Sequence, residues 1–453
     1  VRDEWYDGNA ERRKPGVVTR AAPSFLRFGS LQLAAKRQGA DGLTEVARFA
    51  LAVLSRMEVH DDGATAYLAQ LPRPVPLHLR QACFFARLTK PSCAADHASM
   101  GRQALLRCLL ERTSERTAAL VAAWAALGFA HGVMNTDNLS ILGITIDLNV
   151  YGFLAGYDPA WAPNHIDEES RYAFGAQREI ARWNLRRLAD ALTGTPFQAD
   201  REPDAKTWPQ SSAAGEGTGE SGWLAKDVAA SVLEGFDARY DTCFAARMEL
   251  RLGFRAEGNV CSAEQQQEQQ EQPQAAAVVA GVTSPGCLIR RWVHWLENSG
   301  ADYPRASRAL ADLGERSPLE EAAQLAEHTG AGDGATAELA DFLRLLREAH
   351  SAHEEAAHSA KASGEKKPGA DWRSSVRAAV PLFAPRSHIL REAARFLDLE
   401  QNAGRPFLEA LQSALRLPFG PRTEGADLRD DPRKAWRGVS LEKGMGPLGV
   451  GLG

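Results

Sequence analysis

The sequence has few cysteines and no grouping of them that could bind a metal. Six cysteines are scattered over 453 residues, without a C-x-x-C pair and without the cysteine and histidine spacings typical of zinc sites. We therefore expect no zinc site and mostly reduced thiols. The six residues are Cys83, Cys93, Cys108, Cys243, Cys261 and Cys287.

Long hydrophobic runs and an excess of positive charge are also lacking. The apolar stretch from Ala118 to Ala130 is too short to cross a membrane. Lys and Arg number 53 against 58 Asp and Glu, which gives a formal net charge of −5. Because nucleic-acid binding proteins usually carry a basic surface, we expect neither a nucleic acid nor a membrane as a partner.

Helical periodicity is the main pattern that the chain does contain. Apolar residues such as Leu43, Ala47 and Leu51 recur at helical spacing, and the same spacing follows Leu105 and Leu109. A hydrophobic content of 44% is enough for substantial cores. We predict a mostly helical protein of the α+β class.

Four segments interrupt this pattern because they are rich in small, charged or turn-forming residues, and we predict that they are mobile loops. They are 203–222, 262–285, 329–335 and 351–371. The remaining chain divides into an N-terminal segment 1–35, a core 36–202, a helical part 223–261, a helical C-terminal region 286–435 and an irregular tail 436–453.

The segment from His131 to Asp147 gathers polar residues around a short apolar stretch. Residues 140–146 alternate as in a strand or a tight hairpin, with Asp137 and Asn138 before them and Asp147 after them. A hairpin would bring these three side chains together. Mg²⁺ takes oxygen ligands and often binds to one or two protein groups plus substrate phosphates. The pattern therefore predicts a cation site made of Asn138 and Asp147, with Asp137 left to accept a proton.

A simpler interpretation is that Asp137 and Asn138 only start a turn. Asx side chains commonly bond to their own backbone, and a strand follows here. The spacing of the residues alone does not decide between a turn and a cation site.

Several motifs resemble the selenoprotein O (SelO) family of protein adenylyltransferases. The strongest are RAAPSFLRFGS at 20–30, HGVMNTDNLSILGITID at 131–147 and the segment 164–192. Weaker similarity covers 246–254, 301–310 and 385–397. The motifs stand in the order that the family has them.

The resemblance implies a protein kinase-like fold that binds ATP and transfers AMP to Ser, Thr or Tyr hydroxyls of proteins. It implies that Asp137 is the proton acceptor, that Asn138 and Asp147 bind Mg²⁺ (or Mn²⁺), and that Arg20 and Arg27 contact the nucleotide. A guanidinium presents a rigid fork of donors suited to phosphate oxygens. Eukaryotic members of the family are typically mitochondrial, so the resemblance also suggests that organelle.

The sequence departs from the family in two ways. No glycine-rich phosphate loop, strand lysine or partner glutamate precedes Arg20, so we expect that much of the N-terminal nucleotide-binding lobe is missing. Residues 148–150 replace the Tyr-Gly-Pro that usually follows the metal-binding aspartate. These departures keep two alternatives open: a kinase-like phosphotransferase that transfers the γ-phosphate, and a non-catalytic, truncated interaction protein.

Other polar and aromatic residues of this region are expected to be structural. A histidine just before a catalytic loop, such as His131, more often serves as a hydrogen-bonding residue than as a base. Trp183, Leu185 and Leu188 lie at helical spacing and are predicted to be core residues, whereas Asn164 and Asp167 are expected to support the structure.

Overall fold

The computed structural model describes the chain in ranges that are separated by gaps. These ranges are 2–6, 9–13, 17, 19, 22–59, 99–148, 150–195, 222–254, 284–314, 316–332, 334–361 and 372–380. Arg20, most of the predicted loops 203–222 and 262–285, part of the loop predicted at 351–371, the segment 385–397 and the tail 436–453 lie outside them.

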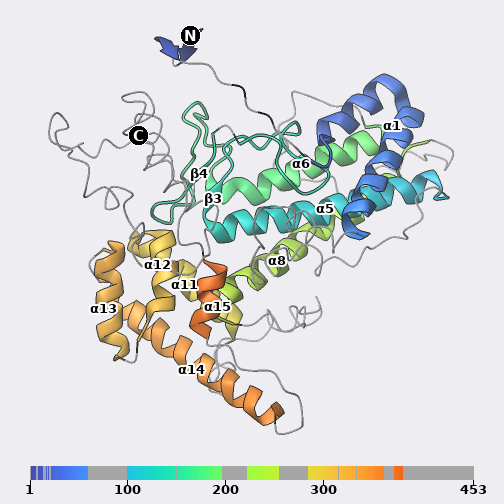
Figure 1. The fold of residues 1–453 in the computed structure, drawn as a ribbon. Coiled ribbons are helices and arrows are strands. Elements are labelled where there is room, and N and C mark those ends of the chain that lie inside the picture. The colour runs from blue at the N-terminus through green and yellow to red at the C-terminus, as the bar shows by residue number, and fades with distance from the viewer. Residues whose placement is uncertain are drawn as a thin grey trace.

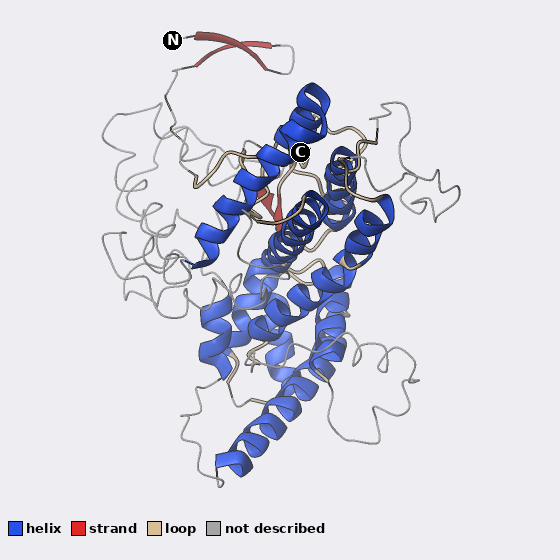
Figure 2. Ribbon diagram, turned by 90° about the vertical axis from the view of Figure 1, so that its right-hand side faces the viewer, coloured by secondary structure: helices blue, strands red, loops and turns tan. Residues whose placement is uncertain are grey.

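The described part is mostly helical with two small antiparallel sheets, which confirms the α+β class (Figures 1 and 2). One sheet pairs β1 (Arg2–Tyr6) with β2 (Asn9–Arg13), and the other pairs β3 (Phe129–Ala130) with β4 (Gly152–Phe153). Within the described residues, no helix is long and apolar enough to cross a membrane.

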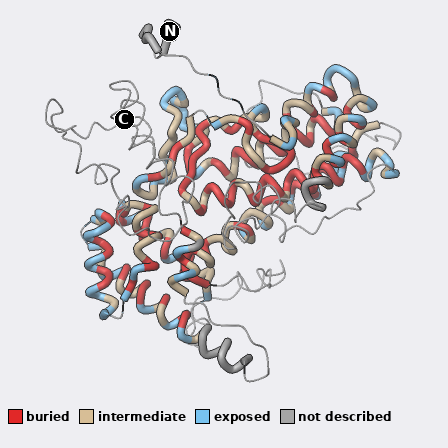
Figure 3. Tube along the Cα trace, in the orientation of Figure 1, coloured by how far each residue is buried: buried red, intermediate tan, exposed pale blue. Residues whose placement is uncertain are grey.

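The first helical layer contains α1 (Phe28–Val59), α5 (Arg102–Leu127), α6 (Gln177–Leu192) and α7 (Lys226–Glu234). The predicted stripe on α1 is buried, since Leu43, Ala47 and Leu51 are each 0% exposed. It packs with α5 and α6 into one core, which is the densely buried region of Figure 3. Gly39 bends α1, because its φ of 64° is a left-handed conformation that glycine adopts without strain.

The second layer begins with α8 (Phe236–Arg251). Its remaining elements are α11 (Pro285–Ser299), α12 (Tyr303–Ala309), η2 (Leu310–Asp312), α13 (Pro318–Thr329), α14 (Ala335–Lys361) and α15 (Trp372–Ala379). Ser317 begins α13 with a capping box, in which its side chain and that of Glu320 satisfy each other's backbone N–H.

Tyr303 joins the two layers close to β3. Its side chain is 1% exposed, and its hydroxyl donates to the Ala126 carbonyl at 2.7 Å. Its backbone N–H donates to Ala155 O, also at 2.7 Å. Buried tyrosine hydroxyls need such partners, so these contacts fix the end of α5, from which the chain enters the loop that starts at His131.

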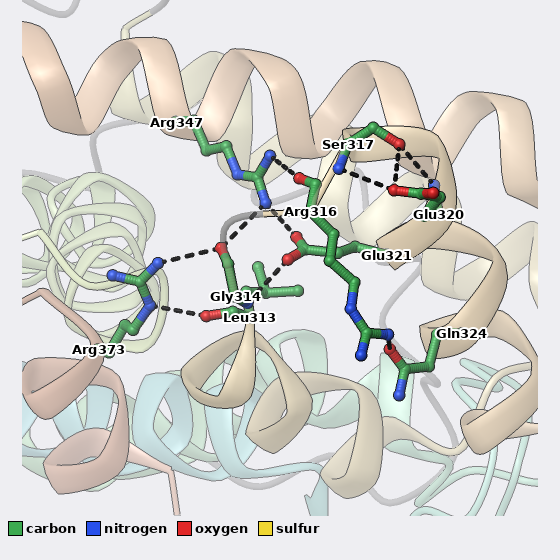
Figure 4. A network of polar contacts seen from close by, with 9 residues as sticks. All are labelled: Leu313, Gly314, Arg316, Ser317, Glu320, Glu321, Gln324, Arg347 and Arg373. Atoms are coloured by element: carbon green, nitrogen blue, oxygen red, sulfur yellow. Dashed lines mark hydrogen bonds and ion pairs between the residues drawn. The ribbon is translucent and has the colours of Figure 1, made fainter.

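A charged network holds the turn between η2 and α13 against α14 and α15 (Figure 4). Glu321 is 4% exposed, pairs with Arg347 and accepts the Gly314 N–H at 2.7 Å. Arg347 also donates to Arg316 O at 2.8 Å, and Arg373 donates to Leu313 O at 2.8 Å. The two guanidinium groups thus satisfy the carbonyls of Leu313, Gly314 and Arg316 in this turn.

One predicted loop requires correction, whereas another is a connection between helices as expected. Residues 351–361 form the C-terminal part of α14 and not a loop, because their Ala, Glu and Lys content favours a helix once α14 has started. The segment 329–335 is a short connection, in which Gly330 adopts φ 70° to end α13 and Gly332 N donates to Ser299 O at 2.8 Å.

Cys243 and Cys287 are free thiols as expected, whereas Cys108 is disulfide-bonded.

Candidate active site

The predicted hairpin after Asn138 is present. Leu139 and Thr145 form an antiparallel bridge, and Ser140 N donates to Ile144 O at 3.1 Å. Gly143 turns the chain with φ 68°, and it packs against the backbone of Arg116, where a Cβ would not fit. The hairpin is therefore held against α5, and it brings residues 138 and 146 opposite each other.

The arginine motif pairs with this hairpin. Arg27 forms a bridge with Ser140, and Phe28 N donates to Leu139 O at 3.1 Å. Gly29 N donates to Thr136 O at 3.0 Å. Two motifs that lie more than a hundred positions apart in sequence thus share one backbone ladder. Arg27 is half-buried beside the predicted catalytic loop, while Arg20 lies outside the described residues.

Asp137 is exposed and lies against the first turn of α1. The N–H groups of Asp137 and Asn138 both point to Asn135 Oδ1, at 3.1 and 3.0 Å. The side chain that forms this turn is therefore that of Asn135, which the sequence interpretation did not consider. The Asp137 carboxylate instead reaches Gly29, where a Cβ would overlap Oδ1. The positive end of the α1 dipole favours an anion at this place.

Asn138 and Asp147 are half-buried on the two arms of the hairpin. Asn138 Nδ2 donates to Val133 O at 2.9 Å, which directs the amide oxygen the other way. The carbonyl of Asn138 accepts from Ile146 N at 3.0 Å. The Thr145 hydroxyl lies 3.1 Å from Asp147 O and 3.3 Å from Asn138 O, so one side chain contacts the backbone of both residues.

Asn138 and Asp147 suit a hard cation whose remaining ligands are water or substrate oxygens. They offer oxygen atoms, which Mg²⁺ prefers, and Mg²⁺ completes its shell with water and substrate phosphates. Among the described residues, no group of three or more His, Cys, Asp or Glu side chains could hold a metal ion by itself. The chemistry of the donors therefore fits Mg²⁺ in the presence of a nucleotide better than a closed structural metal site.

His131 is a buried structural residue, as predicted. Its Nε2 lies 2.5 Å from the Thr145 hydroxyl, and its Nδ1 accepts the Val133 N–H at 3.3 Å. Burial lowers the pKa of His131 to about 4, although the charge and the carbonyl of Asp147 act in the opposite direction. The imidazole is therefore neutral at pH 7, and it orders the hairpin through Thr145.

The segment that follows the site also supports the structure. Asn164 Nδ2 donates to Gly132 O at 3.3 Å, and the Asp167 carboxylate accepts the N–H groups of Arg171 and Tyr172 at 3.0 and 2.7 Å. Leu185 and Leu188 are core residues as predicted, both 0% exposed.

Trp183, also predicted to be in the core, is only half-buried. Arg171 and Arg187 lie over its ring, with guanidinium carbons 4.9 and 5.6 Å from the ring centroid.

The sequence interpretation did not identify Gly29, Thr145, Gln177 or Asn184. Gln177 and Asn184 are buried polar residues of α6 that hydrogen-bond to the backbone of 129–134. Polar residues on the apolar face of an amphipathic helix were the signal that could have revealed these two. Nothing local in the sequence indicates the contact of Gly29 with Asp137.

Comparison with known proteins shows that the chain is similar to bacterial proteins named protein nucleotidyltransferase YdiU. A protein nucleotidyltransferase YdiU of Xanthomonas campestris is 39% identical over 204 residues, which are 45% of this chain and 31% of that protein. The proteins of the same name from Methylobacillus flagellatus and Tolumonas auensis are both 38% identical, over 193 and 192 residues, which are 42% of this chain and 30% of each relative. The chain spans about a third of the length of these curated relatives.

These findings overturn one expectation and give no support to another. The relatives are bacterial, which overturns the mitochondrial localisation inferred from eukaryotic members. The sequence model of the family matches from residue 4, which gives no support to the expected loss of an N-terminal lobe. That model is described as protein adenylyltransferase SelO and matches residues 4–385, so the chain belongs to the SelO family of protein adenylyltransferases.

Proposed function

We propose that this chain transfers AMP from ATP to Ser, Thr or Tyr hydroxyls of proteins, with Mg²⁺ at Asn138 and Asp147, on a kinase-like arrangement of its helical core. The observation that carries the proposal is the pairing of the Arg27 segment with the Asp137–Asn138 loop, through the Arg27–Ser140 bridge and the Gly29 N to Thr136 O bond. This pairing supports the proposal because the segment of Arg27, the proposed phosphate-binding residue, lies next to the loop of Asp137, the proposed proton acceptor. Membership of the adenylyltransferase family supports the same activity.

In this proposal each residue has one role. The hydroxyl oxygen of the substrate protein attacks the α-phosphorus of ATP, and its proton passes to the Asp137 carboxylate. The bond between the α-phosphorus and the oxygen that bridges to the β-phosphorus breaks, so that pyrophosphate leaves. Arg27 binds phosphate oxygens through its guanidinium. Mg²⁺, when bound, neutralises negative charge on the phosphates. Exposure of Asp137 fits its role, because a protein hydroxyl must reach it from outside.

The proposal is tested with ATP labelled either on the α-phosphate or on the γ-phosphate. We expect label on protein from the α-labelled nucleotide only, in a reaction that stops when Mg²⁺ is chelated. Label from γ-labelled ATP alone would show phosphate transfer by a kinase instead. Label from neither nucleotide would contradict the proposed enzyme and favour a non-catalytic interaction protein.

A further inference from the structure

Helix α6 carries two fully buried amide side chains, Gln177 and Asn184, on one face. They are seven positions apart, which is two helical turns, and they are 1% and 0% exposed. Their neighbours on the same face, Ile180 and Leu188, are buried and apolar. Burial of an amide costs free energy unless its polar atoms find partners, so both residues need a reason to lie here.

Both amides bond to the backbone of the segment that leads into Asp137. Gln177 Oε1 accepts the His131 N–H at 3.0 Å, and its Nε2 donates to Phe129 O at 2.9 Å. Asn184 Nδ2 donates to Met134 O at 2.8 Å. Residues 129–134 are thus held to α6 at three backbone atoms, and the last of these lies three positions before Asp137.

The hydrogen bond of Gln177 to His131 is connected to the predicted metal ligands through Thr145. The His131 ring lies 2.5 Å from the Thr145 hydroxyl, which contacts the carbonyls of Asp147 and Asn138. One connected set of hydrogen bonds therefore runs from α6 to both arms of the hairpin.

Asn184 shows that filling the core is not the main role of these side chains. Its Nδ2 donates to Met134 O and, within its own helix, to Ile180 O at 2.8 Å, while its buried Oδ1 has no partner among the described residues. A leucine would fill the same space without an unsatisfied oxygen. The contact with Met134 is the interaction that only an amide provides at this position.

We infer that Gln177 and Asn184 are positioning residues that fix the backbone of 129–134 and thereby the places of Asp137 and Asn138. The catalytic part of this inference rests on the proposed AMP transfer. Group transfer depends on the geometry of the reacting groups, and a displacement of about 1 Å can cost roughly 100-fold in rate. A site supported by a rigid helix keeps that geometry better than a loop that is held only at its ends.

The test uses Gln177→Met and Asn184→Leu, which keep the volume and remove the hydrogen bonds. Gln103→Met is the matched control, because Gln103 also bridges two backbone groups, Trp223 O and Ala225 N, and lies on α5 away from the 129–134 contacts. Two readouts are measured on the whole chain: hydrogen exchange of the amides in 129–139, and the kcat and KM for ATP in AMP transfer.

We expect about 10-fold faster exchange in 129–139 for both variants, with no change in α11 to α14. The kcat should fall by about 10- to 100-fold while the KM for ATP stays within about 2-fold. Gln103→Met should change neither quantity. Should these variants fail to fold, Gln177→Ala and Asn184→Ala also remove the hydrogen bonds and place no new bulk or charge in the core, and the same local exchange is expected.

Wild-type exchange in 129–139 for both variants would overturn the inference, as would faster exchange spread evenly over both layers. A normal kcat in both variants would overturn its catalytic part. If the wild type transfers no AMP, the proposed function fails, whereas the exchange measurement still decides whether these two amides hold the loop.

Discussion

Gly29 and Asp137 are in direct contact, although their motifs lie more than a hundred positions apart in the sequence. A side chain at position 29 would overlap Asp137 Oδ1, and Gly29 N donates to Thr136 O at 3.0 Å. The absence of a Cβ at position 29 therefore lets the carboxylate rest at the N-terminus of α1. The arginine motif and the predicted catalytic loop are joined at this point.

Gly29→Ala should lower activity without lowering stability. Alanine favours a helix over glycine by about 0.5–1 kcal/mol, but its Cβ displaces the Asp137 carboxylate, so we expect a kcat for AMP transfer reduced by about 10- to 100-fold. The control is Gly286→Ala, which replaces the second residue of α11, where a Cβ meets nothing within 4 Å. Equal activities of the two variants in a label-transfer assay would show that the contact has no role.

Asp137→Asn should affect the chemical step more than the binding of ATP. General-base catalysis typically contributes about 10²- to 10⁴-fold, so we expect kcat to fall by that order. The affinity for Mg·ATP, measured by calorimetry, should stay within about 3-fold because Asp137 is not a proposed metal ligand. Asp41→Asn, at an exposed position of α1, is the control. Near-normal turnover of Asp137→Asn would show that Asp137 is only a turn residue and not the proton acceptor.

Whether a feature of this site could be predicted from the sequence depends on how far apart along the chain the contacting residues lie. Local periodicity correctly predicted α1, α5 and the hairpin around Gly143, because those patterns span only a few residues. The contacts of Gln177 with Phe129 and His131 join residues 46 to 48 positions apart, and no local pattern contains them. Helix α14 continues to Lys361 through a segment whose polar composition suggested a loop, so composition was a poor guide there.

Arg347→Met should destabilise the second layer markedly. Glu321 is buried, and removal of its cationic partner leaves an uncompensated charge, which costs about 3–5 kcal/mol for a fully buried pair. We expect about half of that, because Arg347 is partly exposed. Arg344→Met is the control, since the pairs of Arg344 with Asp341 and Glu348 are exposed to solvent and contribute little to stability. Urea unfolding measures the free energy of unfolding of both variants. Equal losses of stability would contradict this prediction.

Glu249→Gln should stabilise the protein at neutral pH. Burial raises the pKa of the Glu249 carboxyl above its usual value of 4.5, and no charged group among the described residues contributes to this shift. Between the unfolded and the folded pKa the native state binds more protons, so the free energy of unfolding of the wild type falls as the pH rises through that window. The stabilisation by glutamine should therefore be present at pH 8 and fade as the pH falls to about 4.5. Urea unfolding at both values measures it, and a gain that is independent of pH would point to a cause other than the charge.

The most direct test of the whole account is transfer of α-phosphate label from ATP to protein by the wild type and by Asp147→Asn, measured side by side with Mg²⁺ present. Asp147 is proposed to act through the metal, so we expect labelled protein with the wild type, and loss of both label and Mg²⁺-dependent nucleotide binding in the variant. Persistence of undiminished labelling in Asp147→Asn would contradict the assignment of the 138–147 hairpin as the centre of the site.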